Sequence, residues 1–255
     1  MFSMPANSLL ADVGAVAMKF DPASGLGTQL QTLTLYLFFA GTVAMGAGAL
    51  YFFLMRNNVA PEYRSTMVVA GLVCAIACFH YLKMTDVYKT GEFPTALRYV
   101  DWLFTTPLLL MKFPLLLRMG ERGTKFFWQL VLLDVAMIVT AFIAETSQVN
   151  SERWWTFFLV SCGFEAFIVY VLYMSLGQAI MEAPAPLAKA LETMRLFVLI
   201  GWAIYPIGFL MARAGYGEYR EIIYNIADVI NKVGFGLVAY RGIEAMSHEH
   251  GHSRA

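Results

Sequence analysis

Seven ionisable side chains stand inside long apolar stretches of this sequence, and they are its clearest candidates for chemistry. They are His80, Arg98, Asp101, Asp134, Glu165, Asp228 and Lys232. A charged group at the middle of a bilayer costs at least about 2.5–3.5 kcal/mol, so each needs a partner or a water-filled cavity. A network of structural ion pairs would supply such partners, and composition alone does not separate that explanation from a functional one.

The polar residues of the segment RYVDWLFTTPLLLMKF follow the repeat of an α-helix. Asp101 and Thr105 are four residues apart, and Lys112 lies eleven residues beyond Asp101, which is about 20° past three full turns. The three side chains therefore share one face over a rise of about 16 Å, with Arg98 about one turn before Asp101. Polar groups spread over so much of a bilayer indicate a proton path.

The segment IIYNIADVINKVGFGLVAY places Asp228 and Lys232 four residues apart on one helix face. Removal from water favours the free amine of a lysine, which attacks an aldehyde to form a Schiff base. A protonated Schiff base requires a nearby anion, and Asp228 and Asp101 are the candidates. Spacing alone also allows a plain buried salt bridge, which is the commoner arrangement.

Aromatic residues accompany these groups. Trp102 adjoins Asp101, and Trp202, Tyr205 and Pro206 occur together in the segment LIGWAIYPIG. An aromatic-rich core usually reflects packing alone. This clustering nevertheless suits the walls of a slot for a long conjugated ligand.

The elements that must position these residues follow from composition. The 255-residue chain is 59% hydrophobic and 14% charged, with a mean hydropathy of +0.60, whereas soluble domains are about 45–50% apolar and about 25% charged. The sequence predicts an all-α membrane protein, a bundle of seven transmembrane helices near residues 30–55, 65–85, 95–117, 126–146, 153–176, 190–212 and 220–244. Residues 1–28 are predicted as an N-terminal segment, 29–246 as the helical domain and 247–255 as a polar, disordered tail.

The connections and the charge balance limit the partners. The segment GQAIMEAPAPLAKALE, with its two prolines, is predicted to connect the fifth and sixth helices. The formal net charge is zero, so we expect lipid and not nucleic acid as the partner. Three cysteines in apolar runs, without zinc-ligand spacing, predict small core residues and no metal site. The loop ends on one side carry ten Lys and Arg residues against six on the other, which predicts an outside N-terminus and a cytoplasmic C-terminus.

The segments RYVDWLFTTPLLL, LIGWAIYPIG and ADVINKVGFG, in this order, resemble the microbial rhodopsins, in particular the proteorhodopsin-type proton pumps, over residues 30 to 245. The resemblance implies a light-driven outward proton pump of the cell (inner) membrane, not an enzyme, with all-trans-retinal bound to Lys232. It favours a Schiff base over the plain salt bridge. A homo-oligomer is also expected, and binding of a carotenoid antenna stays open.

The resemblance also implies a role for each matched residue. Asp101 would be counterion and proton acceptor, Asp228 the second counterion and His80 the partner of Asp101. Arg98 would lie on the extracellular side, and Thr105 would form a hydrogen bond near Asp101. Retinal would be lined by Tyr81, Trp102, Leu109, Met137, Trp202, Tyr205 and Phe209. The leucine at position 109 implies a green-absorbing pigment.

Three residues depart from the family pattern. Lys112 stands where most such pumps have a carboxylic acid as proton donor, so it is either an unusual donor or an inert side chain that reaches the cytoplasmic interface. Arg220 stands where pumps of the bacteriorhodopsin type have a proton-release glutamate, and Glu221, Glu145 or no group at all would replace it. Glu165 occupies a position that is usually apolar or aromatic, toward the retinal ring, unless it faces a neighbouring subunit.

Other functions remain as alternatives. A sensory photoreceptor that signals through a membrane partner usually lacks a proton donor, so the role of Lys112 bears on it. A chloride pump would have a neutral residue in place of Asp101, and a sodium pump would have Asn and Gln at the positions of Asp101 and Thr105. A receptor or transporter without retinal is disfavoured by the motif around Lys232.

Overall fold

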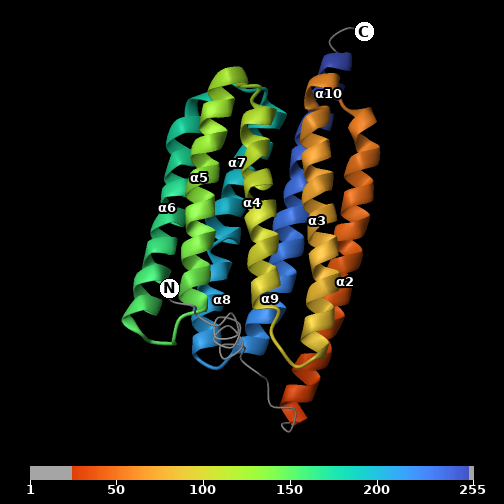
Figure 1. The fold of residues 1–255 in the computed structure, drawn as a ribbon. Helices are drawn as coiled ribbons and strands as arrows, with labels where there is room; N and C mark the ends of the chain where they lie inside the picture. The colour runs from red at the N-terminus through yellow and green to blue at the C-terminus, as the bar shows by residue number, and fades with distance from the viewer. Residues whose placement is uncertain (1–24, 253–255) are drawn as a thin grey trace, which may run out of the picture.

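Seven helical rods form one bundle in the computed structural model, which describes residues 25–252 and the side chains of residues 29–246 (Figure 1). The first five rods are α2 (Gly25–Met55), α3 (Arg64–Lys89), α4 (Thr95–Leu116), α5 (Gly120–Glu145) and α6 (Glu152–Met181). The sixth comprises α7 (Ala185–Leu196), η3 (Phe197–Gly201) and α8 (Ile204–Arg213), and the seventh α9 (Gly217–Val229), η4 (Ile230–Gly234) and α10 (Phe235–His252). Two short 3₁₀ turns, η1 (Arg56–Asn58) and η2 (Pro61–Tyr63), join α2 to α3.

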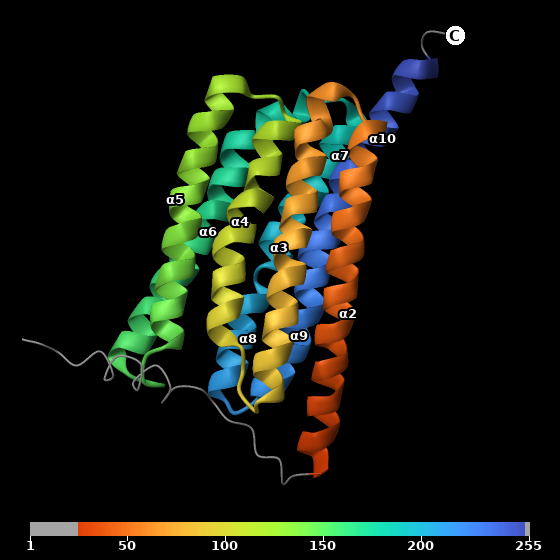
Figure 2. The ribbon, with the colours of Figure 1, turned by 45° about the vertical axis from the view of Figure 1, so that its right-hand side comes forward.

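Six segments of the described chain are long and apolar enough to cross a bilayer. They are Gln29–Asn58, Pro61–Lys89, Gly120–Glu145, Glu152–Met181, Ala185–Arg213 and Gly217–Met246. The remaining rod, α4, lies between α3 and α5 and carries the buried charged residues Arg98, Asp101 and Lys112 (Figure 2). The predicted all-α bundle of seven helices is confirmed, and its orientation in the membrane stays a prediction.

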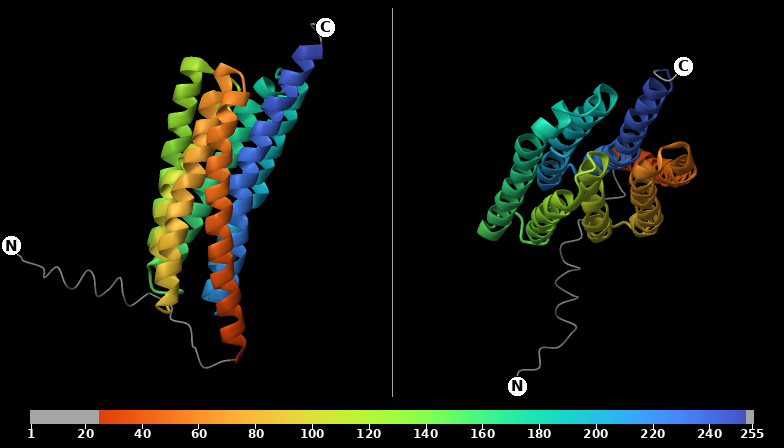
Figure 3. Two further views of the ribbon diagram at one scale, coloured as in Figure 1. Left: turned by 90° about the vertical axis from the view of Figure 1, so that its right-hand side faces the viewer. Right: turned by 90° about the horizontal axis from the view of Figure 1, so that it is seen from above.

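Neighbouring rods alternate in direction, and the last rod closes the bundle. α9 packs against both α2 and α8, and α10 packs against α7. Seen from above, the seventh rod lies between the α2–α3 pair and the sixth rod, while α6 lies at the far edge of the bundle (Figure 3). Side chains of the seventh rod therefore reach the centre of the bundle.

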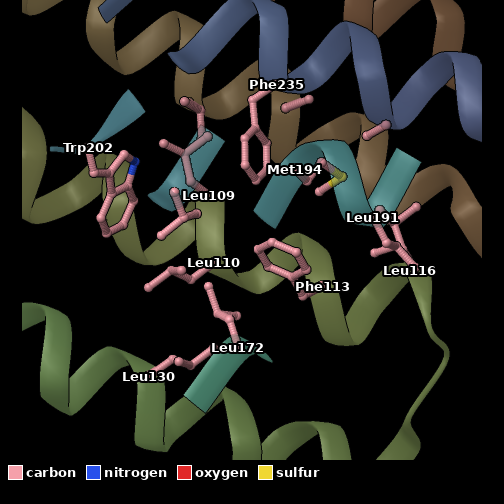
Figure 4. Packing of buried hydrophobic residues seen from close by; sticks show 14 of the residues in the cluster. Leu109, Leu110, Phe113, Leu116, Leu130, Leu172, Leu191, Met194, Trp202 and Phe235 are labelled. Carbon is pink, nitrogen blue, oxygen red and sulfur yellow. The ribbon is translucent and has the colours of Figure 1, made fainter. Parts of the chain in front are cut away.

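Apolar side chains form the core of the bundle and also cover its outside. Leu109, Leu110 and Phe113 of α4 pack with Leu172 of α6 and Phe235 of α10 (Figure 4). The outer surface exposes large apolar groups, including Phe39, Leu132 and Met181. An apolar exterior combined with buried charges is the arrangement expected of a protein dissolved in lipid.

The connection predicted between the fifth and sixth helices is mostly helical, so that prediction is wrong in extent. α6 continues to Met181 and α7 begins at Ala185, which leaves only residues 182–184 between them. Pro186 lies in the first turn of α7, where its missing N–H costs nothing and its fixed φ suits a helix. α10 likewise continues to His252 through most of the predicted disordered tail, whereas most of the predicted N-terminal segment lies outside the described residues.

Two wide π-helical turns interrupt the sixth and seventh rods at the same place. η3 and η4 approach each other, and the Asn231 side-chain amide donates to the Gly201 carbonyl oxygen at 3.1 Å. A Cβ atom at Gly201 would collide with this amide, so glycine permits the contact. Single π-helical turns frequently mark functional sites, and Lys232 lies in η4.

Candidate functional site

Lys232 lies between two carboxylates at the centre of the bundle. Its Nζ atom is 3.0 Å from Asp101 Oδ2 on α4 and 3.0 Å from Asp228 Oδ2 on α9. All three side chains are at most 2% exposed. The structure therefore brings together the three groups that the sequence placed on two separate helices.

The two carboxylates have unequal support for negative charge. Asp228 accepts hydrogen bonds from Tyr205 Oη at 2.7 Å, Tyr81 Oη at 3.0 Å and Trp102 Nε1 at 3.3 Å. Asp101 has ion pairs but no such donor among the described residues, since both of its oxygens lack a hydrogen bond. Hydrogen bonds to a carboxylate stabilise its charged form, so the negative charge of Asp228 has the stronger support.

His80 and Thr105 flank Asp101 in different ways. The His80 Nδ1 atom is 3.5 Å from Asp101 Oδ1 and 2.9 Å from the Ile76 carbonyl oxygen. The Thr105 hydroxyl donates to the main-chain oxygen of Asp101 at 2.8 Å, not to the carboxylate. His80 is therefore the side chain through which α3 reaches the Asp101 carboxylate.

A chain of alternating charges continues toward the end of the bundle where α4 and α9 begin. The Arg98 guanidinium lies 3.5 Å from Asp228 and donates to Glu221 at 2.6 Å and to Asn225 at 3.0 Å. Arg220 joins Glu221, at 3.0 Å, to Glu145, at 2.6 Å. Two buried arginines thus neutralise both candidate release glutamates, between which the sequence did not decide.

Asn225 is a site residue that the sequence analysis did not identify. Residues 221, 225, 228 and 232 are separated by intervals of four, three and four, which is the spacing of one helix face. The same rule that paired Asp228 with Lys232 would have extended the face to Asn225 and Glu221.

Lys112 is fully buried and does not reach the end of the bundle. Its Nζ atom has no hydrogen-bond partner in the described part of the chain. It lies 4.9 Å from the centre of the Phe235 ring on α10. This placement opposes the inert alternative, in which the side chain extends to the interface.

An apolar cavity lies beside Lys232, and its wall consists mainly of hydrophobic and aromatic side chains with a few polar groups, as is usual for small-molecule sites. Of the residues predicted to line a ligand, its wall includes Trp102, Leu109, Met137, Trp202, Tyr205 and Phe209. Tyr81 does not belong to this wall and contacts Asp228 instead. The wall of the cavity includes residues of α4, α5, α6, α8 and α9 as well as η4.

Asp134 has a structural partner. The Thr106 hydroxyl lies 2.7 Å from Asp134 Oδ2 and 2.8 Å from the Trp102 carbonyl oxygen. This contact joins α5 to α4 beside the cavity. Asp134 Oδ2 therefore has a partner within the protein, whereas Oδ1 is buried without a hydrogen-bond partner among the described residues.

Comparison with known proteins finds similar sequences and similar structures over most of this chain. The family model described as bacteriorhodopsin-like protein matches residues 32–246. The green-light absorbing proteorhodopsin of Gamma-proteobacterium EBAC31A08 is 32% identical over 240 residues, which cover 91% of this chain and 95% of the relative. The crystal structure of Exiguobacterium sibiricum rhodopsin matches with a TM-score of 0.80 and 44% identity, over 86% of this chain and 98% of the other. Xanthorhodopsin, described as a light-driven ion pump with dual chromophore, matches with a TM-score of 0.80 and 30% identity, over 88% of this chain and 97% of the other.

Proposed function

We propose, from the premise that this chain belongs to the bacteriorhodopsin-like family, that it is a light-driven outward proton pump of the cell membrane. The observation that carries the proposal is the position of Lys232 Nζ, 3.0 Å from both Asp101 and Asp228 and on the wall of the apolar cavity. At this position the amine can attach a ligand that occupies the cavity, and it can exchange a proton with a carboxylate.

The cavity fits all-trans-retinal as the chromophore. Lys232 is the one lysine on the wall, and its amine would hold the aldehyde carbon of retinal. Trp102, Trp202 and Tyr205 would enclose the conjugated chain. Leu109 also lies on this wall, and a leucine at this position is the basis for the prediction of a green-absorbing pigment. When bound, retinal supplies absorption of visible light and a light-induced change of shape.

The protein's own groups would then move a proton in one direction. Asp101 takes the proton released at Lys232 Nζ, because Asp228 is already stabilised as an anion by three donors. Arg98, 3.5 Å from Asp228, supplies a second positive charge to the pair of carboxylates. Lys112 lies on the opposite side of Asp101 from Arg98 along α4, where it would return a proton to the Lys232 nitrogen. With the N-terminus outside, this order moves protons outward.

Light-driven pH change tests the proposed function. Cells that express the protein with retinal are expected to acidify an unbuffered medium under illumination, and a protonophore should abolish the signal. Asp101→Asn removes the acceptor, so it should eliminate acidification while a visible band remains. Pigment formation without any pH change would contradict pumping and favour a sensory role, and alkalinisation would contradict the outward direction.

The His80–Asp101 contact predicts a titration of colour. Loss of the negative charge on Asp101 should shift the visible band to the red as the medium is acidified. Because Lys232 Nζ joins Asp101 to Asp228, the midpoint belongs to this pair of carboxylates and not to one residue. Absorbance spectra recorded across the pH range should show a displaced midpoint for His80→Ala, whereas an unchanged midpoint would show that this 3.5 Å contact has no electrostatic effect.

A further inference from the structure

Glu165 places a carboxyl group on the wall of the cavity, on a different rod from Lys232. It lies thirteen residues after the start of α6, and Lys232 lies fifteen residues after the start of α9. Both helices begin at the same end of the bundle (Figure 1), so the two residues are at depths of about 20 and about 22 Å along their rods. A ligand attached at Lys232 that extends across the bundle toward α6 thus approaches Glu165.

The serine and threonine hydroxyl groups on this part of the wall already have hydrogen-bond partners within the protein. Ser161 Oγ donates to the Met137 carbonyl oxygen at 2.9 Å, and Thr106 Oγ1 lies within hydrogen-bond distance of the Trp102 carbonyl oxygen and of Asp134 Oδ2. Glu165 is the one carboxyl-bearing residue among those that line the cavity. Across the described chain, no hydrogen bond or ion pair joins its side chain to another residue. The Glu165 side chain is partly buried, and a polar group beside apolar side chains without a partner is unfavourable, so a partner from the ligand would stabilise it.

We propose that the cavity prefers a retinoid whose ring carries a hydroxyl group, with that hydroxyl paired to Glu165. The inference rests on the proposed function, because it presumes a retinoid attached at Lys232. A hydroxyl both donates and accepts hydrogen bonds, so it pairs with Glu165 whether or not the carboxyl is protonated. A keto group pairs only with the protonated acid, and an unsubstituted hydrocarbon ring leaves the carboxyl without a partner.

The position of Glu165 favours selection of the ligand over assembly of subunits. The sequence left open whether this side chain faces a neighbouring subunit, and the structure places it on the cavity wall with Cys162 and Phe158. A site that offers a hydrogen bond discriminates strongly against an analogue that lacks the matching group. Glu165 would therefore determine which retinoid is retained, while Lys232 attaches it.

Competition between two aldehydes tests the proposal. The full chain, prepared without chromophore, is mixed with equal amounts of all-trans-retinal and all-trans-3-hydroxyretinal, and the bound retinoids are released with hydroxylamine and measured by chromatography. We expect the bound ratio of hydroxylated to plain retinoid to be about tenfold higher in the unmodified protein than in Glu165→Met, which corresponds to about 1.4 kcal/mol. Glu152→Met, which removes an exposed carboxyl in the first turn of the same helix and away from the cavity wall, should keep the ratio of the unmodified protein.

The outcomes separate this proposal from the proposed function. If plain retinal alone yields a visible band but the bound ratio is the same with and without Glu165, the hydroxyl pairing is wrong and water satisfies the carboxyl. A ratio of one or below in the unmodified protein overturns it without any variant, so the test does not depend on whether Glu165→Met folds. If neither aldehyde yields a visible band, the proposed attachment at Lys232 fails together with this inference.

Discussion

Replacement of Lys232 by Ala is expected to abolish the visible absorption band of the protein reconstituted with all-trans-retinal. The methyl group of alanine cannot attack the aldehyde, and Lys232 is the one lysine on the cavity wall. Without a covalent bond, added retinal should keep the near-ultraviolet spectrum of the free aldehyde. Absorbance spectra before and after addition of retinal measure the effect, which is complete loss and not a shift.

The control must separate loss of attachment from loss of folding. Lys232→Ala leaves Asp101 and Asp228 without the ammonium that lies 3.0 Å from each, and breaking a buried ion pair costs about 3–5 kcal/mol. The double variant with Asp101→Asn removes the carboxylate charge that loses its ammonium partner, whereas Asp228 keeps Arg98, so this variant should fold more readily while it stays colourless. Adding retinal as a preformed alkylamine adduct should restore colour in the single variant. Colour with retinal alone would place the attachment elsewhere.

The bundle and its central ion pairs were predictable because two strong physical signals coincide in the sequence. Long apolar runs predict spans, and charges within them at helical spacing predict which faces meet. Asp101, Asp228 and Lys232 satisfy both conditions, and the structure brings their charged atoms together. No such signal exists for the π-helical turns, because the Asn231–Gly201 contact depends on how closely two rods approach.

Helix ends were less predictable than helix existence. Pro184 and Pro186 suggested a long connection, whereas α6 continues to Met181 and Pro186 lies in the first turn of α7. A proline is favourable in the first turn of a helix, whereas a proline in the interior of a helix interrupts it. Composition therefore marked the correct place but overestimated the length of the break.

The sequence did not show which way a buried polar side chain faces where no second polar residue lies at helical spacing from it. Glu165 stands alone in an apolar run, so its helix face was not fixed until the packing of α6 placed it on the cavity wall. The sequence did not decide between Glu145 and Glu221 as the group for proton release. In the sequence, Arg220 was recognisable only as a departure from the family pattern and not as the partner of both glutamates. Arg220 forms buried ion pairs with both glutamates. Glu145 lies on α5 and Arg220 on α9, and no local sequence pattern connects these two helices.

Lys112→Ala is expected to slow recovery of the resting visible band after a light flash by at least about tenfold, or about 1.4 kcal/mol of barrier. Lys112 is fully buried, and no salt bridge is formed by its ammonium among the described residues. A buried ammonium without an anion is costly, which favours the neutral amine at rest. A neutral amine must take up a proton before it can return one to Lys232, so uptake precedes or accompanies that transfer.

Flash photolysis of Lys112→Ala at several pH values distinguishes this order of events. Without the amine, the returning proton comes from solvent, so recovery should become steeply slower as pH rises while the resting colour stays nearly constant. Lys112→Glu introduces a carboxylic acid donor and should restore faster recovery, and Lys83→Ala, at an exposed lysine, should change nothing. A recovery rate for Lys112→Ala equal to that of the unmodified protein would show that Lys112 only packs against Phe235 and would strengthen the sensory alternative, which requires no donor.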